Sequence, residues 1–534
     1  MIEKNWQDLS LKEQIAQMIV VRASGHLYDH QIRYPVWEAT NDRLKKWLRE
    51  LNLGGVILLG GSSVELQARS QQLQGWSKLP LFIAADVEEG IGQRFPGGTW
   101  FPPPMALSAI YEQNPDSARE YARQMGRITA REAATVGLNW LLAPVVDVNN
   151  NPNNPVINIR AFGDRSEVVA DLTTAFIEGA KSAGVLTTAK HFPGHGDTAT
   201  DSHLELPTIL HDESRLAAVE LPSFIKAIAA GVDSVMTAHL LIPAWDEQRP
   251  ATLSSKIVTE QLRNRLGFTG LVVTDALIMG GITRYAPPEE VAVMAVEAGC
   301  DVLLMPDHPE VAIASIYSAV ESGRISQRRI QQSWARIRRA KQKIVASEIA
   351  PVELGDRQAS LTVNSILQDS IQTTPSKTIS QSESGGRNLI VVDDVLNTAY
   401  LDLNSPAIAI PDRFNYQRQI VDRSTLDCML LDSRPTLLQV FIRGNPFRGS
   451  AGLTTHAKQI YQRLVANQQL EAIVVYGSPY VWQWFQNIAS DLPGVFTYGQ
   501  MEEAQAIALK TLFNREFARD LDLLTSKFQG DFGF

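Results

Sequence analysis

Residues suited to proton transfer or metal binding are concentrated in one short segment of the chain. Residues 190–203, KHFPGHGDTATDSH, hold one lysine, three histidines and two aspartates in fourteen positions, although the 534 residues include only nine histidines. Imidazole and carboxylate groups act as metal ligands and as general acids and bases. The segment therefore indicates a metal site, a proton-transfer site or a polar loop.

A metal site is the weakest of these three interpretations. Five side chains of the segment are of metal-binding types: His191, His195, Asp197, Asp201 and His203. The amidohydrolase type of metal barrel, however, places an H-x-H pair on its first strand, and the first apolar run here, MIVVRAS at 18–24, has no histidine. The glycines and prolines of FPGHGD predict a loop, on which helical ligand spacing does not apply. We expect no metal and no other cofactor.

Proton transfer is supported by Asp201-Ser202-His203, which places a carboxylate two residues from an imidazole. On a turn, the carboxylate can accept a hydrogen bond from one ring nitrogen and stabilise the imidazolium, so that the other nitrogen exchanges a proton. The same three residues also fit a simple turn cap, and taken alone they favour that interpretation.

Polar side chains also end several apolar runs elsewhere in the chain. These side chains are Asp86, Asp147, Lys190 with His191, His239, and Asp275. In a parallel barrel the carboxyl ends of the strands meet at one rim, where catalytic residues lie. We therefore expect an active site at this rim. Asp147 and His239 fit a structural role at the rim equally well.

The elements that position these side chains follow a repeating pattern. Eight apolar runs lie at 18–24, 55–61, 81–88, 140–148, 184–192, 233–240, 271–279 and 301–306. Unbroken apolar runs are typical of strands buried on both faces. Helical patterns at 115–137 and 212–231 end in glycine, and SLKE at 10–13 is a capping box. Residues 1–350 are therefore predicted to form a (β/α)8 TIM-type barrel.

The rest of the chain predicts a second, smaller domain. Residues 351–386 are interpreted as a linker, because 372–386 are polar and lack periodicity. Residues 387–534 are predicted to form an α/β (αβα) sandwich. Its apolar runs are at 388–395, 406–411, 436–444 and 470–478, and its helical patterns are at 456–469 and 501–513.

Composition narrows the class of protein. Hydrophobic residues make up 44% and charged residues 20%, as in soluble globular proteins. The net charge of −9 provides no basic patch for nucleic acid or an anionic membrane. Two cysteines, Cys300 and Cys428, cannot build a disulfide framework. No secretory signal or membrane span is visible, so we expect a cytoplasmic protein.

Several longer segments resemble one known family. AKHFPGHGDTATDSHLELP at 189–207 and GFTGLVVTDALIMGGI at 267–282 are similar to signature segments of glycoside hydrolase family 3. They are most similar to its β-N-acetylglucosaminidase (β-N-acetylhexosaminidase) branch, the NagZ-like enzymes, which the Asp-Ser-His dyad separates from the family's β-glucosidases. The resemblance covers roughly residues 6–345 and implies a (β/α)8 barrel, which in many members is followed by an α/β domain.

The resemblance also implies roles for individual residues. Asp275, in VVTDAL, matches the family's nucleophile, and His203 matches the general acid/base, with Asp201 as its dyad partner. Five further residues match sugar-binding positions: Asp86, Arg94, Arg160, Lys190 and His191. For Arg160 and Lys190, buried salt bridges are the alternative.

One segment departs from the family pattern. Members of this branch often read D-x-E-G-G-R-V-x-R, whereas DVEEGIGQR at 86–94 has Glu89 in place of a glycine and Ile91 in place of an arginine. Arg94 keeps its spacing from Asp86. We therefore expect the sugar contact to be kept and the loop geometry to differ.

The implied activity is that of a retaining exo-β-N-acetylglucosaminidase. It would release terminal non-reducing β-linked GlcNAc from small carbohydrates, of which the resemblance implies muropeptides with GlcNAc-β-1,4-(anhydro)MurNAc in peptidoglycan recycling. A family 3 phosphorylase or β-glucosidase is the alternative within the family. A non-catalytic carbohydrate-binding protein on the same fold is the alternative of another class. The sequence does not indicate an oligomeric state.

Overall fold

Two compact units make up the part of the chain that the structure describes. The computed structural model describes Trp6 and residues 9–202, 204–345, 351–375, 379, 385–395, 398, 400–444 and 452–513. The division between the units falls at Thr362 and Val363. Strands β1 to β8 belong to the first unit and strands β9 to β14 to the second.

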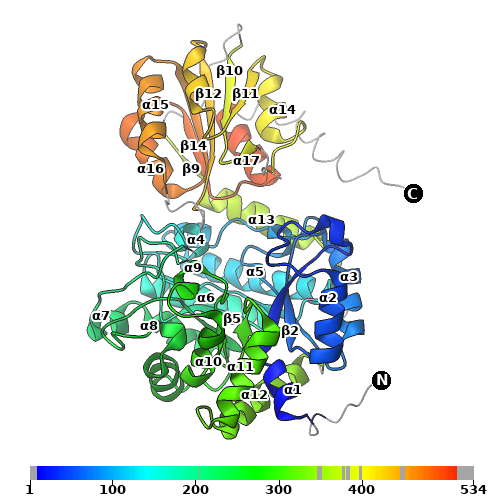
Figure 1. Ribbon diagram of the computed structural model, residues 1–534. Helices are drawn as coiled ribbons and strands as arrows, with labels where there is room; N and C mark the ends of the chain where they lie inside the picture. The colour runs from blue at the N-terminus through cyan, green and yellow to red at the C-terminus, as the bar shows by residue number, and fades with distance from the viewer. Residues whose placement is uncertain are drawn as a thin grey trace. The chain divides into compact units, whose positions relative to one another are not determined.

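Eight parallel strands form the barrel of the first unit (Figure 1). They are β1 (Ile19–Ser24), β2 (Gly55–Leu59), β3 (Phe82–Ala85), β4 (Trp140–Leu141), β5 (Thr188–Phe192), β6 (Ser234–Thr237), β7 (Leu271–Thr274) and β8 (Leu303–Leu304). Hydrogen bonds join them in the orders β4-β3-β2-β1-β8 and β5-β6-β7. Isolated parallel bridges, Trp140 with Leu186 and Val273 with Val302, close the two sets into a ring. The predicted (β/α)8 barrel is confirmed.

Burial on both faces explains why the strands were visible as continuous apolar runs. Every residue of β3, β5, β6 and β7 is buried, so these strands show no apolar–polar alternation. Each of the eight predicted runs contains one strand. The helices around them are α1 (Leu11–Ala16), α2 (Asn41–Lys46), α3 (Ser63–Trp76), α4 (Met105–Tyr111), α5 (Pro115–Thr135), α6 (Ser166–Lys181), α7 (Glu213–Ala218), α8 (Leu221–Ala229), α9 (Gly280–Thr283), α10 (Pro288–Ala298), α11 (Pro309–Glu321) and α12 (Gln327–Val345).

Helix ends follow the sequence signals with one correction. Ser10 and Glu13 form the predicted capping box of α1, and α5 stops just before Gly137, whose φ is +84°. The single helix predicted at 212–231 was wrong, because the segment divides into α7 and α8. Pro222, in the first turn of α8, has no amide hydrogen to continue a helix from α7.

A buried lysine lies at the amino-terminal end of the barrel. The Nζ of Lys341, in α12, donates hydrogen bonds to Gln17 Oε1 at 2.7 Å and to the Gly54 carbonyl at 2.8 Å. It also lies 4.8 Å from the ring centroid of Phe82. Among the described residues no carboxylate pairs with this ammonium group, and burial lowers its pKa to about 7. The charged form of Lys341 is therefore poorly stabilised in the folded barrel.

The second unit is an α/β sandwich around one mixed sheet. Its strand order is β11 (Gln417–Val421), β10 (Arg387–Val391), β12 (Thr436–Ile442), β13 (Leu470–Gly477), β14 (Gly494–Thr497) and β9 (Gln372–Thr373). Only β9 is antiparallel to its neighbour. Figure 1 shows α14 (Pro406–Asp412) and α17 (Glu502–Phe513) on one side of the sheet, and α15 (Thr455–Ala466) and α16 (Pro479–Ile488) on the other. The predicted sandwich is confirmed.

Details of this unit differ from the sequence prediction. The run PAIAIP at 406–411, predicted as a strand, forms α14, which starts with Pro406 in its first turn. The neighbouring strand is instead β11, at the sheet edge, where Gln417 and Arg418 are exposed. An edge strand with polar, exposed residues has no apolar run to reveal it. The short strands β9 and β14 were also not predicted.

The segment predicted as a linker, 351–386, is partly built into both units. Val352 and Gly355 donate backbone hydrogen bonds to Thr135 and Glu132 of α5 at 3.0 Å and 2.8 Å. Helix α13 (Arg357–Ser370) follows, and β9 joins the sheet of the second unit. The linker prediction is therefore corrected for these residues. Among the described residues, no helix has the length and apolar character needed to cross a bilayer.

Replacing Lys341 with methionine is expected to change how stability depends on pH. In the folded barrel the lysine has a pKa of about 7, whereas the usual value is 10.5. Between these values the unfolded chain binds more protons, so the native protein gains stability as pH rises. Lys341→Met removes this gain. We measure the unfolding temperature of the variant minus that of the native protein by circular dichroism at each pH. This difference should become more negative, or less positive, between about pH 7 and about pH 9. A difference independent of pH would contradict the shifted pKa.

Candidate active site

The carboxyl ends of the barrel strands bring six predicted polar residues to one rim. Lys190 and His191 are the third and fourth residues of β5. Asp86 and Asp275 directly follow β3 and β7, Asp147 comes after β4, and His239 comes after β6. Because the strands are parallel, these side chains share the end of the barrel at which active sites form.

A buried carboxylate, Glu88, is the centre of a charged cluster at this rim. Arg160 donates to both of its oxygens, from Nε at 2.8 Å and from Nη2 at 2.7 Å. Lys190 Nζ lies 2.6 Å from Glu88 Oε1 and 2.7 Å from Asp86 Oδ1. The Glu88 and Lys190 side chains are 4% and 2% exposed. Arg160 and Lys190 therefore form the salt bridges of the alternative interpretation, while the Arg160 side chain remains 19% exposed.

The charges of the cluster stabilise the ionised forms of Glu88 and Lys190. Burial alone would raise the pKa of Glu88, but the charges of Arg160 and Lys190 hold that pKa well below its usual range. Burial would lower the pKa of Lys190, but Asp86 and Glu88 raise it. Glu88 and Lys190 thus stay charged across the physiological pH range.

Asp86 is the member of the cluster that faces solvent. Its side chain is 34% exposed, and Arg94 donates from Nε to its backbone carbonyl at 3.1 Å. An accessible carboxylate flanked by a fixed ammonium and a guanidinium offers acceptors and donors to a polar ligand such as a sugar, and charge-assisted hydrogen bonds are the strong ones. The predicted sugar-binding residues Asp86, Arg94, Arg160 and Lys190 therefore lie together, with His191 beside Lys190.

Asp147 organises the start of the histidine-rich loop. Its carboxylate accepts hydrogen bonds from His191 Nδ1 at 2.8 Å and from the His195 amide at 2.7 Å. Burial would raise the pKa of Asp147, but the charge and hydrogen bond of His191 lower it. Asp147 is 1% exposed. It therefore acts through His191 and His195, as the rim interpretation predicted.

His239 has a comparable supporting position beside the predicted nucleophile. Its Nδ1 lies 2.9 Å from Thr252 Oγ1, and its Nε2 lies 3.1 Å from the carbonyl of Ala276, the residue after Asp275. The Asp275 carboxylate accepts a hydrogen bond from the Ala276 amide at 2.7 Å. His239 thereby fixes the backbone that carries Asp275.

His195 is locked inside the loop by two hydroxyl groups. Its Nδ1 lies 2.8 Å from Thr198 Oγ1 and its Nε2 lies 2.8 Å from Ser202 Oγ. Burial and the neighbouring charge of His191 lower its pKa to about 4, so the ring is neutral near pH 7. Asn154 holds the same loop by donating to the His195 carbonyl at 2.7 Å. His195 therefore positions Ser202, the middle residue of the Asp-Ser-His dyad.

The dyad loop approaches the loop that follows Asp275. Asp201 is 3% exposed, and His203 lies outside the described residues. The Gly281 amide donates to the Ser202 carbonyl at 3.2 Å. A Cβ atom at Gly281 would lie 2.7 Å from the Ser202 carbonyl oxygen and 2.8 Å from that of Glu205, closer than real Cβ atoms come. Glycine is therefore required at position 281 for this approach.

The two departures from the family pattern are both directed into the protein. Trp100 Nε1 donates to Glu89 Oε2 at 3.0 Å, and Glu89 is fully buried. Ile91 is also fully buried. The turn at Gly90, with φ of +87°, separates them. These residues thus shape the loop from within, while Asp86 and Arg94 stay at the rim.

Several residues of the site were not singled out from the sequence. Glu88 lay within the quoted DVEEGIGQR segment, and its fixed spacing from Asp86 was the available signal. Asn154 and Gly281 gave no signal, because their roles depend on contacts between loops distant in sequence. Among the described residues, no group of three or more His, Cys, Asp and Glu side chains could hold a metal ion.

Comparison with known proteins agrees with the barrel and its rim. The model of the glycosyl hydrolase family 3 N-terminal domain matches residues 10–340, and that of the bacterial glycosyl hydrolase family 3 C-terminal domain matches residues 379–514. A barrel with this rim and a following α/β sandwich is the architecture of a glycoside hydrolase. The chain belongs to glycosyl hydrolase family 3.

Named relatives come from the same family. Beta-hexosaminidase A of Pseudoalteromonas piscicida is 36% identical over 335 residues, which cover 57% of this chain and 56% of that relative. The chain thus matches little more than half of that relative's length. The beta-hexosaminidase of Alkalilimnicola ehrlichii is 36% identical over 282 residues, which cover 52% of this chain and 80% of that protein.

Solved structures resemble the chain over nearly its whole length. A family 3 beta-N-acetylglucosaminidase from Paenibacillus is 30% identical with a TM-score of 0.79, over 94% of this chain and 96% of that chain. A beta-glucoside phosphorylase has a TM-score of 0.80 over 96% and 94%, but its identity of 21% indicates a shared fold alone.

Replacing Gly281 with alanine is expected to separate the dyad loop from the loop that carries Asp275. The new methyl group must displace the Ser202 or Glu205 backbone. Because a shift of about 1 Å in a reacting group can cost about 100-fold in rate, we expect kcat to fall at least about tenfold. Steady-state glycosidase assays measure this loss. Gly75→Ala in α3 is the matched control, since nothing lies within 4 Å of its Cβ. Full activity of a folded Gly281→Ala variant would contradict the proposed approach.

Proposed function

We propose that the chain is a retaining exo-β-N-acetylglucosaminidase that releases terminal non-reducing β-linked GlcNAc. The proposal rests on one observation: Asp275, the Asp201 loop and the Glu88 cluster lie at the same end of the barrel. The beta-hexosaminidase names of relatives at 36% identity support the acetamido sugar. A phosphorylase, a β-glucosidase and a non-catalytic binding protein gain no specific support from the site.

The proposed reaction has two steps: the first forms a covalent intermediate and the second hydrolyses it. Asp275 attacks the anomeric carbon, and the bond from that carbon to the leaving oxygen breaks, which leaves a glycosyl ester on Asp275. His203 gives its proton to the leaving oxygen. In the second step His203 removes a proton from water, and the water oxygen replaces the Asp275 carboxylate at the anomeric carbon.

Asp201 supports the histidine in this scheme. Its carboxylate is buried at the rim and two residues from His203, so it can orient one ring nitrogen and stabilise the imidazolium. A histidine with the ordinary pKa of ~6.5 can act as acid and base near neutral pH. Asp86, Arg94, Arg160, Lys190 and His191 would hydrogen-bond the sugar hydroxyl and acetamido groups.

The proposed natural substrate is a small cell-wall carbohydrate. Muropeptides with GlcNAc-β-1,4-(anhydro)MurNAc carry the terminal sugar that this site would accept, and their recycling would occur in the cytoplasm. A histidine in place of a second carboxylate adds no negative charge, so it also reduces repulsion of a leaving group that carries a carboxylate, as muramic acid does.

Substrate preference provides the direct test. We expect the protein to release nitrophenol from the aryl β-N-acetylglucosaminide in phosphate-free buffer. The kcat/KM for this substrate should be at least about tenfold higher than that for the aryl β-glucoside, because a site that hydrogen-bonds the acetamido group loses those bonds with glucose. Asp275→Asn is the control and should remove this activity without unfolding the barrel. Preference for glucose, or turnover only with added phosphate, would contradict the proposal.

The proposed general-acid role of His203 can be tested with leaving groups of different pKa. His203→Ala should reduce kcat/KM strongly for disaccharides, whose leaving oxygen needs a proton, and much less for aryl glycosides with activated leaving groups. The measurement is a series of aryl glycosides with leaving groups of increasing pKa. Equal losses across this series would assign His203 a structural role.

A further inference from the structure

One ion pair closes the part of the histidine-rich loop that carries the dyad. Asp197 Oδ2 lies 2.7 Å from Nε2 of His211, which is fourteen residues further along the chain. The two side chains are 24% and 32% exposed. Because a carboxylate oxygen only accepts, Nε2 of His211 carries a hydrogen and donates it. The segment between the two partners contains Asp201 and Ser202.

The backbone beside His211 is anchored to the segment that follows β6. The Ile209 amide donates to the Leu241 carbonyl at 2.9 Å, and the Leu241 amide donates to the Pro207 carbonyl at 2.9 Å. Ile209 is also buried, at 2% exposure. His211 therefore reaches Asp197 from a backbone that is itself fixed to the barrel.

Arg215 supports Asp197 from a second direction. Its Nη2 lies 3.6 Å from Asp197 Oδ2, and its Nη1 donates to both carboxylate oxygens of Glu220 at 2.9 Å. Glu220 is 4% exposed and directly precedes α8. A Cβ atom at Gly194 would lie 2.7 Å from Glu220 Cγ, so the same glutamate packs against the first part of the histidine-rich loop. Asp197 is thus held by groups from α7 and from the segment before it.

The residue after Asp197 connects this ion pair to the dyad. Thr198 Oγ1 lies 2.8 Å from Nδ1 of His195, and Nε2 of that ring lies 2.8 Å from Ser202 Oγ. Asp197 and Thr198 are joined by a peptide bond, so a shift of Asp197 disturbs both contacts. Asp201 directly precedes Ser202 and is 3% exposed, so it moves together with Ser202.

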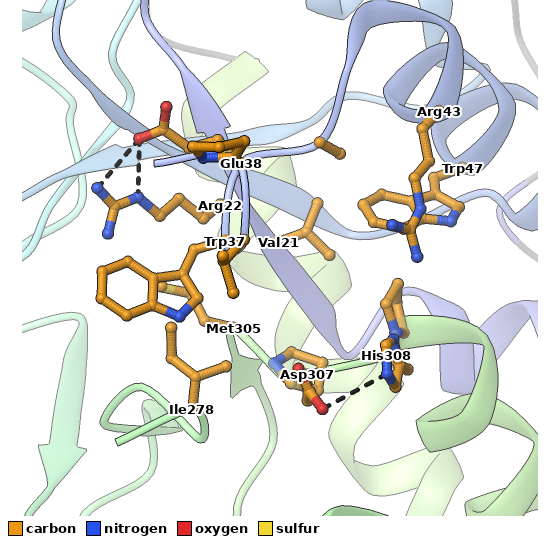
Figure 2. A pocket seen from close by; sticks show the side chains of 15 residues that line it. Val21, Arg22, Trp37, Glu38, Arg43, Trp47, Ile278, Met305, Asp307 and His308 are labelled. Carbon is orange, nitrogen blue, oxygen red and sulfur yellow. Dashed lines mark hydrogen bonds and ion pairs between the residues drawn. The ribbon is translucent and has the colours of Figure 1, made fainter. Parts of the chain in front are cut away.

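Another histidine–aspartate contact at the barrel rim lacks this property (Figure 2). His308 Nε2 lies 3.5 Å from Asp307 Oδ2, beyond the end of β8. The two residues are neighbours in sequence, and their side chains are 58% and 46% exposed. Their contact therefore encloses no other residue. The contact between Asp197 and His211 is shorter, and it restricts the conformations of the whole segment between its partners.

We propose that Asp197 and His211 are positioning residues that hold Asp201 and Ser202 in the geometry required for the acid/base step. The inference rests on the proposed glycosidase function and deepens it. Neither residue touches the sugar in this assignment, because the groups proposed to bind the sugar belong to the Glu88 cluster and its neighbours. The pair therefore acts on the rate of bond cleavage and leaves sugar binding unchanged.

His211→Ala tests this assignment through kcat and KM. We expect kcat for the disaccharide GlcNAc-β-1,4-GlcNAc to fall about tenfold, because a shift of about 1 Å in a reacting group can cost about 100-fold in rate. KM should change less than about twofold, as expected when the lost interaction acts in the transition state alone. Steady-state kinetics with the purified full chain measure both constants.

Two variants serve as rescue and control for this measurement. His211→Gln should restore most of kcat, because the glutamine amide nitrogen can take the place of Nε2 as the donor to Asp197. His456→Ala should keep the native kcat, because it removes a comparable pair in the second unit, in which His456 Nε2 lies 3.0 Å from Asp427 Oδ1. A loss confined to KM, or no rescue by glutamine, would overturn the assignment.

Asp197→Ala supplies a reciprocal test that does not depend on the folding of His211→Ala. It should lower kcat at least as much, since it removes the partner of both His211 and Arg215. The double variant Asp197→Ala/His211→Ala should lose no more rate than Asp197→Ala alone, because residues that act through one contact are not additive. Full activity of Asp197→Ala, or losses that multiply in the double variant, would overturn the assignment.

Hydrogen exchange separates this inference from the proposed function, because it needs no turnover. The amides of Leu204 and Glu205 donate to the Asp201 carbonyl at 3.0 Å and report on the enclosed segment. In His211→Ala we expect them to exchange at least about tenfold faster than in the native protein, with β6 unchanged. Faster exchange in a protein without glycosidase activity would overturn the proposed reaction and keep the positioning role. Unchanged exchange would overturn the positioning role, whatever the activity.

Discussion

The whole rim depends on one buried carboxylate held between two cations. Glu88 is nearly inaccessible, yet it accepts hydrogen bonds from Arg160 and lies in contact with Lys190. Removing one partner of such a group leaves an uncompensated buried charge, which typically costs about 3–5 kcal/mol. The interaction joins the loop after β3 to β5 and to the loop after β4, so that three strand ends are fixed against one another. Asp86 then takes its direction from Lys190, which holds it at the edge of the cluster facing solvent.

A second constraint acts between loops rather than between charges. The histidine-rich loop is held partly by its own contacts, those of His195 with Thr198 and Ser202, and partly by neighbouring segments. Asp147 fixes its first part, Asn154 fixes its middle, and the close approach at Gly281 fixes its last part. These contacts come from the segments after β4 and β7. Precision at the dyad is thus a property of the barrel rim as a whole, as preorganised sites require.

The sequence predicted the barrel well because its strands are buried on both faces, and continuous apolar runs such as LVVT of β7 follow directly from that burial. It predicted the polar strand ends for the same reason, since Asp275 and Lys190 stand out against apolar neighbours. The sequence-based prediction failed for a strand that is exposed at the sheet edge and for segments in which a proline changes or interrupts the secondary structure. The exposed edge strand β11 has no apolar run, PAIAIP was predicted as a strand yet forms α14, and Pro222 divides a helical pattern. Glu88, Asn154 and Gly281 could not be recognised by their types, because their roles lie in partners far away in sequence.

The His195 ring couples two hydroxyl groups of the histidine-rich loop. A neutral imidazole has one nitrogen that donates and one that accepts. If Nδ1 donates to Thr198 Oγ1, then Nε2 accepts from the Ser202 hydroxyl, and if Nδ1 accepts from Thr198, then Nε2 donates to Ser202. In either tautomer one hydroxyl is a donor to the ring and the other an acceptor, so the polarity of Thr198 and that of Ser202 are linked through a buried ring. The serine between Asp201 and His203 is thus one end of a chain of hydrogen bonds, and an alanine there would remove the partner of His195 Nε2.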